Sequence, residues 1–225
     1  MLERFIQTIR TDDAGTEDAA ATRERMRAGF PPGAVRRMTQ LGMLVGGILN
    51  ELDPAPGDTI IYATQYAEGR TLETYLDSFP AMSPTGFQTS IHPSAVQQGM
   101  IRRARPAGDF FPMAGGDCLA GQSLLAAFLA PADRVILCGG EERGSWLVPI
   151  EAASARAFAF GMLLTRSNAA AAAGAAAPAP GRIALAPDDG AFSPLAPGAW
   201  FDLLHARENF SGVIAPGWRA TLSWR

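Results

Sequence analysis

The most informative stretch of the sequence is Ala114-Gly115-Gly116-Asp117-Cys118-Leu119-Ala120-Gly121, in which small residues surround one cysteine. The pattern predicts a strand over 109–113 and a helix over 119–130, so Cys118 would lie on a sharp strand-to-helix turn. Small neighbours allow the backbone to bend tightly there and a ligand to approach closely. The free N–H groups and the dipole of a helix N-terminus also favour thiolate over thiol. Cys118 is therefore either a small core residue or a nucleophile.

Length and composition indicate one domain, alone or with an appendage. The chain has 225 residues, of which 48% are hydrophobic, and a net charge of −3. This charge gives no reason to expect binding to nucleic acids or membrane surfaces. Only two cysteines are present, Cys118 and Cys138, which favours a reducing compartment over a disulfide framework. No signal peptide and no apolar run of membrane-spanning length are recognised, so the sequence predicts a cytoplasmic protein.

Short apolar runs and amphipathic stretches alternate along the chain, which predicts an α/β fold. Strands are expected at 5–9, 59–64, 109–113, 133–142, 157–165, 182–185 and 219–224, and helices at 34–52, 71–79, 94–101, 119–130 and 199–205. The Ala- and Pro-rich segment 167–181 is expected to be a linker or a surface loop. Arg102, Arg103 and Arg105 form a basic cluster, which is either a solvated helix end or a contact for an acidic partner.

Short motifs between residues 36 and 142 resemble the first half of a β-ketoacyl-ACP synthase, which has the thiolase fold. Arg36-Arg37-Met38 is similar to the family's Arg-Arg-Met helix start, and Cys118-Leu119-Ala120-Gly121 to its nucleophile turn. Gly139-Gly140-Glu141 resembles the family's strand ending in Gly-Gly-x-Glu, and Ser83-Pro84 falls where the family places a loop lining the acyl channel. The resemblance implies a thiolase-like α/β fold, a single N-terminal-type half with a mixed sheet flanked by helices.

The chain lacks the second half of such a synthase, which supplies two histidines that polarise the thioester carbonyl. Its only histidines are His92 and His205, and neither lies in a matching motif, so both are interpreted as structural residues. The half-length pattern is similar to the β-ketoacyl synthase-like chain length factors of bacterial aryl polyene and related pigment pathways. We accordingly expect a half-thiolase domain at 1–166, a linker or loop at 167–181, and an appendage at 182–225 that completes the same domain.

This resemblance implies a partner subunit of a full-length ketosynthase, in a heterodimer that extends a chain carried on an acyl carrier protein. Cys118 would be a nucleophile or the vestige of one, and neither a cofactor nor a metal is implied. The family pattern places the acyl channel or the subunit interface at Ser83, Phe87, Phe110, Phe111, Met113 and Gly121. Claisen condensation also needs a general acid or base, which the sequence does not supply beside Cys118. We therefore expect little condensing activity from this chain alone.

Packing gives two further expectations, because each half of the resembled fold buries its central helices against the other half. A lone half would expose the Gly42/Gly46 and Gly121/Ala127 helical faces. The strand 109–113 would pair with its counterpart across a two-fold axis, although Pro112 removes one donor.

Two other functions are considered: an independent acyltransferase or thioesterase that uses Cys118 with His92 as base, and a purely structural or carrier-docking protein.

Overall fold

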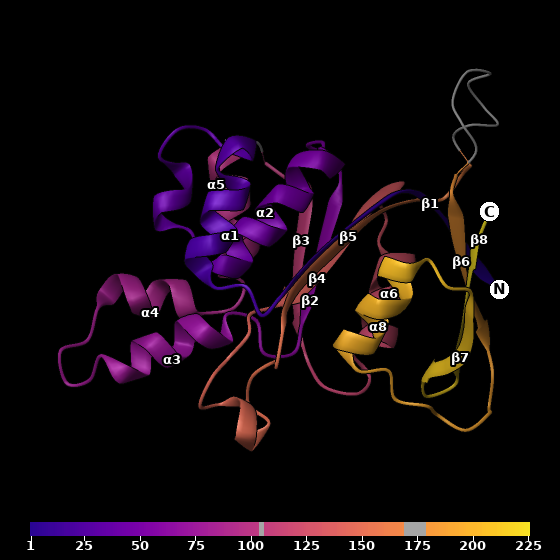
Figure 1. The fold of residues 1–225 in the computed structure, drawn as a ribbon. Helices are drawn as coiled ribbons and strands as arrows, with labels where there is room; N and C mark the ends of the chain where they lie inside the picture. Colours follow the sequence, from indigo (N-terminus) through magenta and orange to yellow (C-terminus); the bar gives the residue numbers. More distant parts are fainter. Residues whose placement is uncertain (104–105, 169–178) are drawn as a thin grey trace.

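The computed structural model describes residues 1–103, 106–168 and 179–225, and for residues 102 and 103 the backbone alone. Its centre is an eight-stranded mixed sheet in the order β3-β2-β4-β5-β1-β6-β8-β7 (Figure 1). The neighbours β3, β2 and β4 are parallel, and all other neighbouring strands are antiparallel. The strands are β1 (Leu2–Gly15), β2 (Thr59–Thr64), β3 (Asp109–Ala114), β4 (Arg134–Glu141), β5 (Ala157–Thr165), β6 (Gly181–Pro187), β7 (Phe210–Ala215) and β8 (Trp218–Trp224).

Helices cover both faces of the sheet. One face carries α1 (Ala19–Met26), α2 (Gln40–Leu52) and α5 (Ser94–Arg103), and the other carries α6 (Leu119–Leu129) and α8 (Pro197–Ala206). A helical hairpin of α3 (Gly69–Asp77) and α4 (Pro84–Ser90) projects from the body of the molecule (Figure 1). The described residues also form three short 3-10 helices: η1 (Arg27–Gly29), η2 (Ala34–Arg37) and η3 (Val148–Ile150).

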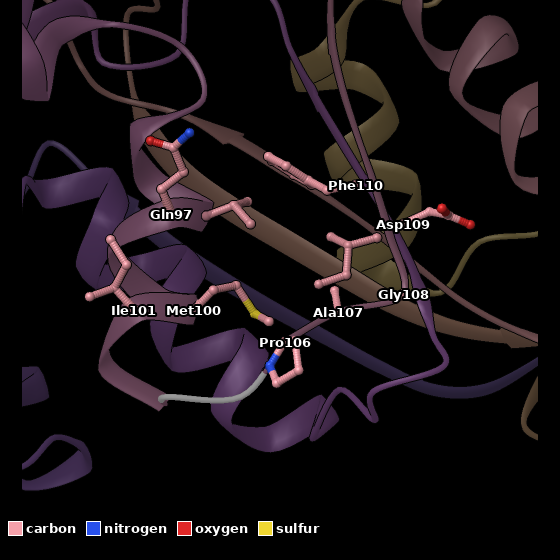
Figure 2. Close-up of a pocket in the computed structure, with 10 residues that line it drawn as sticks. Gln97, Met100, Ile101, Pro106, Ala107, Gly108, Asp109 and Phe110 are labelled. Atoms are coloured by element: carbon pink, nitrogen blue, oxygen red, sulfur yellow. The ribbon is translucent and has the colours of Figure 1, made fainter.

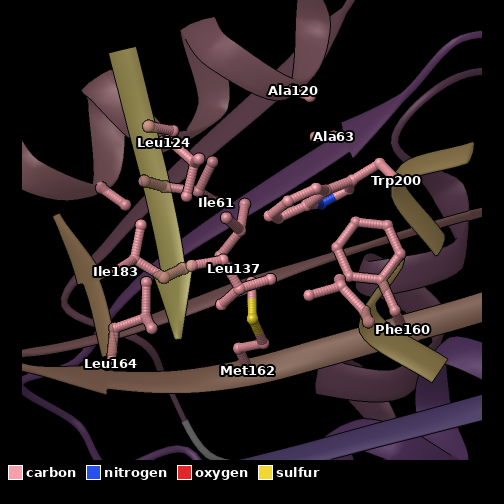
Figure 3. Packing of buried hydrophobic residues seen from close by; sticks show 14 of the residues in the cluster. Ile61, Ala63, Ala120, Leu124, Leu137, Phe160, Met162, Leu164, Ile183 and Trp200 are labelled. Atoms are coloured by element: carbon pink, nitrogen blue, oxygen red, sulfur yellow. The ribbon is translucent and has the colours of Figure 1, made fainter. Parts of the chain in front are cut away.

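The central strands are buried on both faces, which explains why they are continuous apolar runs in the sequence. Along β2, Ile60 and Tyr62 join the core under α2, whereas Ile61 and Ala63 join the core under α6. This alternation follows from the two-residue period of a strand. Figure 3 shows the α6 side of this core, with Trp200 packed near the strands. The predicted α/β fold with a mixed sheet flanked by helices is confirmed.

Several element boundaries differ from the sequence prediction. Strand β1 extends far beyond the expected 5–9, because β5 and β6 pair with it on its two sides. The helix expected over 34–52 is interrupted: η2 ends at Arg37, and Thr39 then caps α2 by accepting the Gly42 N–H at 2.9 Å. Helix α4 and strand β7 were not predicted.

The prediction that Gly- and Ala-rich helical faces would be exposed is wrong, because the chain covers them itself. Gly121 is buried against the backbone of Ile214 in β7, and Ala127 of the same helix is fully buried. Gly46 of α2 is buried against the side chains of Phe30 and Met38, and Gly99 of α5 packs on its backbone. Gly121, which the family pattern places at a channel or subunit interface, is thus covered within this chain.

The C-terminal strands cause this coverage of α6. Strands β6, β8 and β7 extend the sheet beyond β1 and curl around α6 and α8, as Figure 1 shows. In the resembled fold, the second half would cover this face of α6. Here residues 181–225 of the same chain cover it. Among the helices of the described ranges, none is both long and apolar enough to cross a membrane. The expected linker falls largely on 169–178, outside the described residues, as do Arg105 and the side chains of Arg102 and Arg103.

Candidate functional site

Cys118 lies at the strand-to-helix turn that the sequence predicts. Strand β3 ends at Ala114, and Cys118 is the residue immediately before α6. The turn is held by two backbone bonds: Gly115 N–H donates to Thr64 O at 3.4 Å, and Leu119 N–H donates to Gly116 O at 2.9 Å. The Cys118 thiol is half-buried and is not in a disulfide. This turn therefore presents a sulfur atom at the carboxyl end of two parallel strands.

Neither imidazole is engaged with that sulfur. His92 Nδ1 lies 3.2 Å from Thr64 Oγ1, and its ring stacks on Tyr62 with centroids 5.1 Å apart. Burial lowers the pKa of His92, so its neutral form is favoured. His205 Nδ1 lies 3.0 Å from Thr11 Oγ1 on the surface. Within the described residues no hydrogen bond joins either histidine to Cys118, and the structure shows no base activated beside the thiol.

Cys138 is a core residue. Its side chain is fully buried in β4 among the apolar residues under α2. Burial raises the pKa of the Cys138 thiol to about 12, which keeps it neutral and unreactive. This agrees with its interpretation from the sequence as apolar filling of a strand.

A group of buried glutamates fixes the loops around the Cys118 turn. Glu141 accepts the N–H groups of three successive residues, 65–67, at 2.5 to 2.8 Å. Burial raises the pKa of Glu141 to about 7, although these hydrogen bonds oppose that rise. Glu142 accepts Leu41 N–H at 3.2 Å and Thr71 N–H at 2.8 Å. These carboxylates hold the loop after β2 against β4.

Glu73 holds a second loop, at residues 145–147, and its pKa is lowered, whereas the pKa of Glu141 is raised. It accepts N–H groups from Ser145 at 2.6 Å and Leu147 at 2.9 Å, and pairs with Arg70 at 2.9 Å. Although burial acts to raise the pKa of Glu73, these bonds lower it to about 2. The sequence reading missed Glu68, Glu73 and Glu142. The one available signal was a Glu-Glu pair directly after an apolar strand and two glycines.

Arginines line two adjoining clefts beside the α3–α4 hairpin. One cleft, of about 470 Å³, is bordered by Arg23, Arg36, Arg37 and Arg70, and the next, of about 510 Å³, by Arg70 and Arg143. Three acids also line the clefts, and each already has partners: Glu17 pairs with Arg25, Asp18 caps α1, and Glu142 accepts backbone N–H groups. In the described part of the chain, Arg36, Arg37 and Arg143 form no ion pair. We call this pair of clefts the arginine trench, and its charge suits an anionic partner.

The residues expected at the acyl channel or interface fall in two places. Ser83 caps α4 by accepting the Gly86 N–H at 3.1 Å, and Phe87 is 52% exposed on the same helix. The other group is on β3: Phe111 is 47% exposed, and Met113 packs partly against the core under α6. Phe110, also on β3, lines a cavity. Gly121 is not part of either group.

That cavity is apolar and has a volume of about 380 Å³. Its walls are α5 and the first residues of β2 and β3, and Figure 2 shows Met100 of α5 pointing toward Pro106 and Ala107. It therefore lies at the opposite end of β3 from Cys118. Its size and lining suit a hydrocarbon chain or an apolar side chain of a partner.

Comparison with solved structures identifies the fold. The chain superposes on a structure of the ketosynthase ApeO in complex with its chain length factor ApeC from Xenorhabdus doucetiae, with a TM-score of 0.65 and 18% identity, over 99% of this chain and 100% of that one. A β-ketoacyl synthase from Burkholderia phymatum STM815 gives a TM-score of 0.56 and 11% identity, over 86% of this chain and 66% of that one. No family model and no curated protein sequence matches the chain.

A third solved structure, the ishigamide ketosynthase/chain length factor, gives a TM-score of 0.56 and 11% identity. That match covers 83% of this chain and 64% of that one. At these identities the likeness concerns the fold, and the expected thiolase-like ketosynthase fold is confirmed. The chain spans about two thirds of the length of the second and third matches, whereas it spans the whole of the first.

Proposed function

We propose that this chain is a chain-length-factor-like partner subunit of a β-ketoacyl-ACP synthase. It would shape the acyl channel of a heterodimer and add little condensing chemistry of its own. The end-to-end likeness to a chain from a ketosynthase–chain length factor complex supports this proposal, because the match covers 99% of this chain and 100% of the matched one. Following the family resemblance of the sequence, we further propose an aryl polyene or related pigment as the product.

The observation that carries the proposal is the open edge at β3. Among the described strands, β3 pairs with β2 alone, so its other edge has no strand beside it. Apolar side chains are exposed next to this edge, including Phe111 on β3 and Ile101, which is 75% exposed on α5. Free edges combined with exposed apolar surface are features of interfaces rather than of isolated monomers. We propose that the ketosynthase subunit covers this edge.

The surroundings of Cys118 support a non-condensing role. A positioned general acid or base contributes roughly 100- to 10,000-fold in rate, and within the described residues no such group is bonded to the Cys118 thiol. His92, the base considered for an independent acyltransferase or thioesterase, is occupied by Thr64 and Tyr62. We therefore favour the partner role over that alternative. Mass spectrometry after incubation with acyl carrier thioesters decides whether Cys118 is acylated.

The arginine trench supports an acyl carrier protein as the second partner. The carrier arm is attached through a phosphodiester, and guanidinium groups recognise phosphate and carboxylate oxygens by paired hydrogen bonds. Arg36 and Arg37 are exposed and, in the described chain, unpaired, so they are available for such contacts. We propose that the carrier approaches on this side of the α3–α4 hairpin.

Co-expression with a full-length ketosynthase tests the proposal. We expect the two chains to elute together as one complex in size-exclusion chromatography with light scattering. The complex should condense malonyl and acyl carriers, whereas this chain alone should not. A chain that elutes alone and condenses malonyl carriers unaided would contradict the proposal.

A further inference from the structure

Three buried polar atoms at the end of β2 have no protein partner. They are Tyr62 Oη, Glu68 Oε2 and His92 Nε2, and each is out of contact with solvent. The Tyr62 and Glu68 side chains are themselves 0% and 1% exposed. Buried polar atoms in native proteins are nearly always hydrogen-bonded, either to protein or to ordered water. Three such atoms in one short region therefore indicate a bound polar molecule.

The three residues belong to one contact group that joins β2 to α5. The Tyr62 ring stacks on His92 with an angle of 14° between the ring planes, and His92 Nδ1 lies beside Thr64 Oγ1. Glu68 Oε1 accepts the N–H of Ala95, in the first turn of α5, at 2.6 Å. Each residue thus has one side fixed by protein and one polar atom left over.

Besides His92, the charged and titratable groups that act on Tyr62 and Glu68 are acids. Glu141, Glu142 and Cys138 act on Tyr62, and Glu142 also acts on Glu68. No cluster of His, Cys, Asp or Glu within the described residues has a composition that could hold a metal ion. Burial favours the uncharged form of all three side chains, because it raises the pKa of Tyr62 and Glu68 and lowers the pKa of His92. A neutral molecule with both donors and acceptors therefore suits them, and water is the smallest one.

We propose that an internal water molecule bridges Tyr62, Glu68 and His92 and fastens the start of α5 to the end of β2. The water accepts the O–H of Tyr62 and the O–H of a protonated Glu68, and it donates one hydrogen to Nε2 of His92. His92 carries its proton on Nδ1, which donates to Thr64 Oγ1. This assignment uses three of the hydrogen bonds that a buried water can make, and it leaves none of the three atoms unpaired.

Two consequences follow, and neither depends on the proposed function. Burial and the neighbouring Glu142 raise the pKa of Glu68 to about 8, so the protonated carboxyl that the bridge needs is the main form at neutral pH. His92 is fixed on both ring nitrogens, which removes it as a base for Cys118. It is thus a structural residue because of its contacts, as the sequence reading expects.

NMR of the imidazole nitrogens tests the bridge directly, since the chain has only two histidines. We expect His92 to remain neutral, with its proton on Nδ1, at a pH where an imidazole in water is charged. Tyr62→Phe should shift the Nε2 signal of His92 and lower Tm by about 3 to 6 °C. Thr59→Val is the matched control, because Thr59 Oγ1 is also buried without a partner but lies at the other end of β2. Thr59→Val should change neither the Nε2 signal of His92 nor Tm.

Glu68→Gln tests the protonated carboxyl, since the amide keeps a donor for the water and an acceptor for Ala95. The unfolded chain loses the Glu68 proton near pH 4.5, whereas the folded chain keeps it to about pH 8. Wild type should therefore lose stability relative to Glu68→Gln as the pH rises through that interval, and the difference should then level off. A His92 that takes up a proton as readily as an imidazole in water, or an Nε2 signal unchanged by Tyr62→Phe, would overturn the proposal.

Discussion

The two ends of the sheet are finished in opposite ways. At the β7 end, the chain curls back so that β7 and α8 cover α6, and Ile214 and Ala220 are almost fully buried. At the β3 end, the edge strand has one neighbour and carries the exposed Phe111. The chain therefore completes its own core on one side and keeps apolar surface on the other. Under the proposed function, the partner subunit covers β3 and leaves α6 to the chain's own C-terminal strands.

The largest expected effect is a loss of stability at the β7 end of the sheet. Gly121→Leu places a side chain where the backbone of Ile214 and the side chain of Ala215 already lie. Because backbone atoms cannot move aside as a flexible side chain does, we expect a loss of about 3 kcal/mol or more of unfolding free energy. Chemical denaturation measures this loss. Gly116→Ala is the control, since its added methyl would meet nothing within 4 Å, and an equal loss there would remove the argument.

A substitution at the β3 end should weaken binding of the partner subunit and leave folding unchanged. Phe111→Glu puts a charge on the free edge, and we expect the affinity for the ketosynthase subunit to fall about 30-fold or more, in the range of an interface hot spot. Tm should change little, since Phe111 is half exposed. Surface plasmon resonance measures the affinity. Ile150→Glu, at a 66% exposed apolar residue in η3, is the matched control and should bind normally. Equal binding by both variants would place the interface elsewhere.

The contrast between the two ends also separates what the sequence could predict from what it could not. The turn at Cys118 was predictable because small residues, an apolar run before them and an amphipathic run after them are all local signals. The cover of Gly121 by Ile214 joins residues far apart in the chain, and no periodicity encodes it. Glu141 likewise read as a motif residue, although its role is to bind three N–H groups of a distant loop. Long-range packing decided which predicted faces are exposed.

The arginine trench extends the comparison to a second surface, beside the α3–α4 hairpin. Exchanging both Arg36 and Arg37 for Glu should weaken binding of the acyl carrier protein about 10-fold, because two uncompensated cations become anions. The loss should be smaller at high salt, since screening weakens exposed charges. Isothermal titration at two salt concentrations measures both effects. Arg27→Glu is the control, because Arg27 is exposed outside the trench and pairs with Glu24. Equal binding of the carrier to both variants would show that the arginine trench is not the carrier-binding surface.

Cys118→Ala is expected to give the smallest effect and to sharpen the contrast furthest. The thiol is half-buried, and no hydrogen bond within the described residues depends on it, so removing sulfur should change unfolding free energy by about 1 kcal/mol or less. If the partner subunit performs the condensation, the activity of the complex should change by less than about two-fold, well below the roughly 100-fold or greater loss expected for a catalytic nucleophile. Steady-state assays of the complex measure this change. A large loss of activity with unchanged complex formation would make Cys118 a working nucleophile, and the open edge at β3 would then join two active subunits instead of an active subunit and a channel-shaping one.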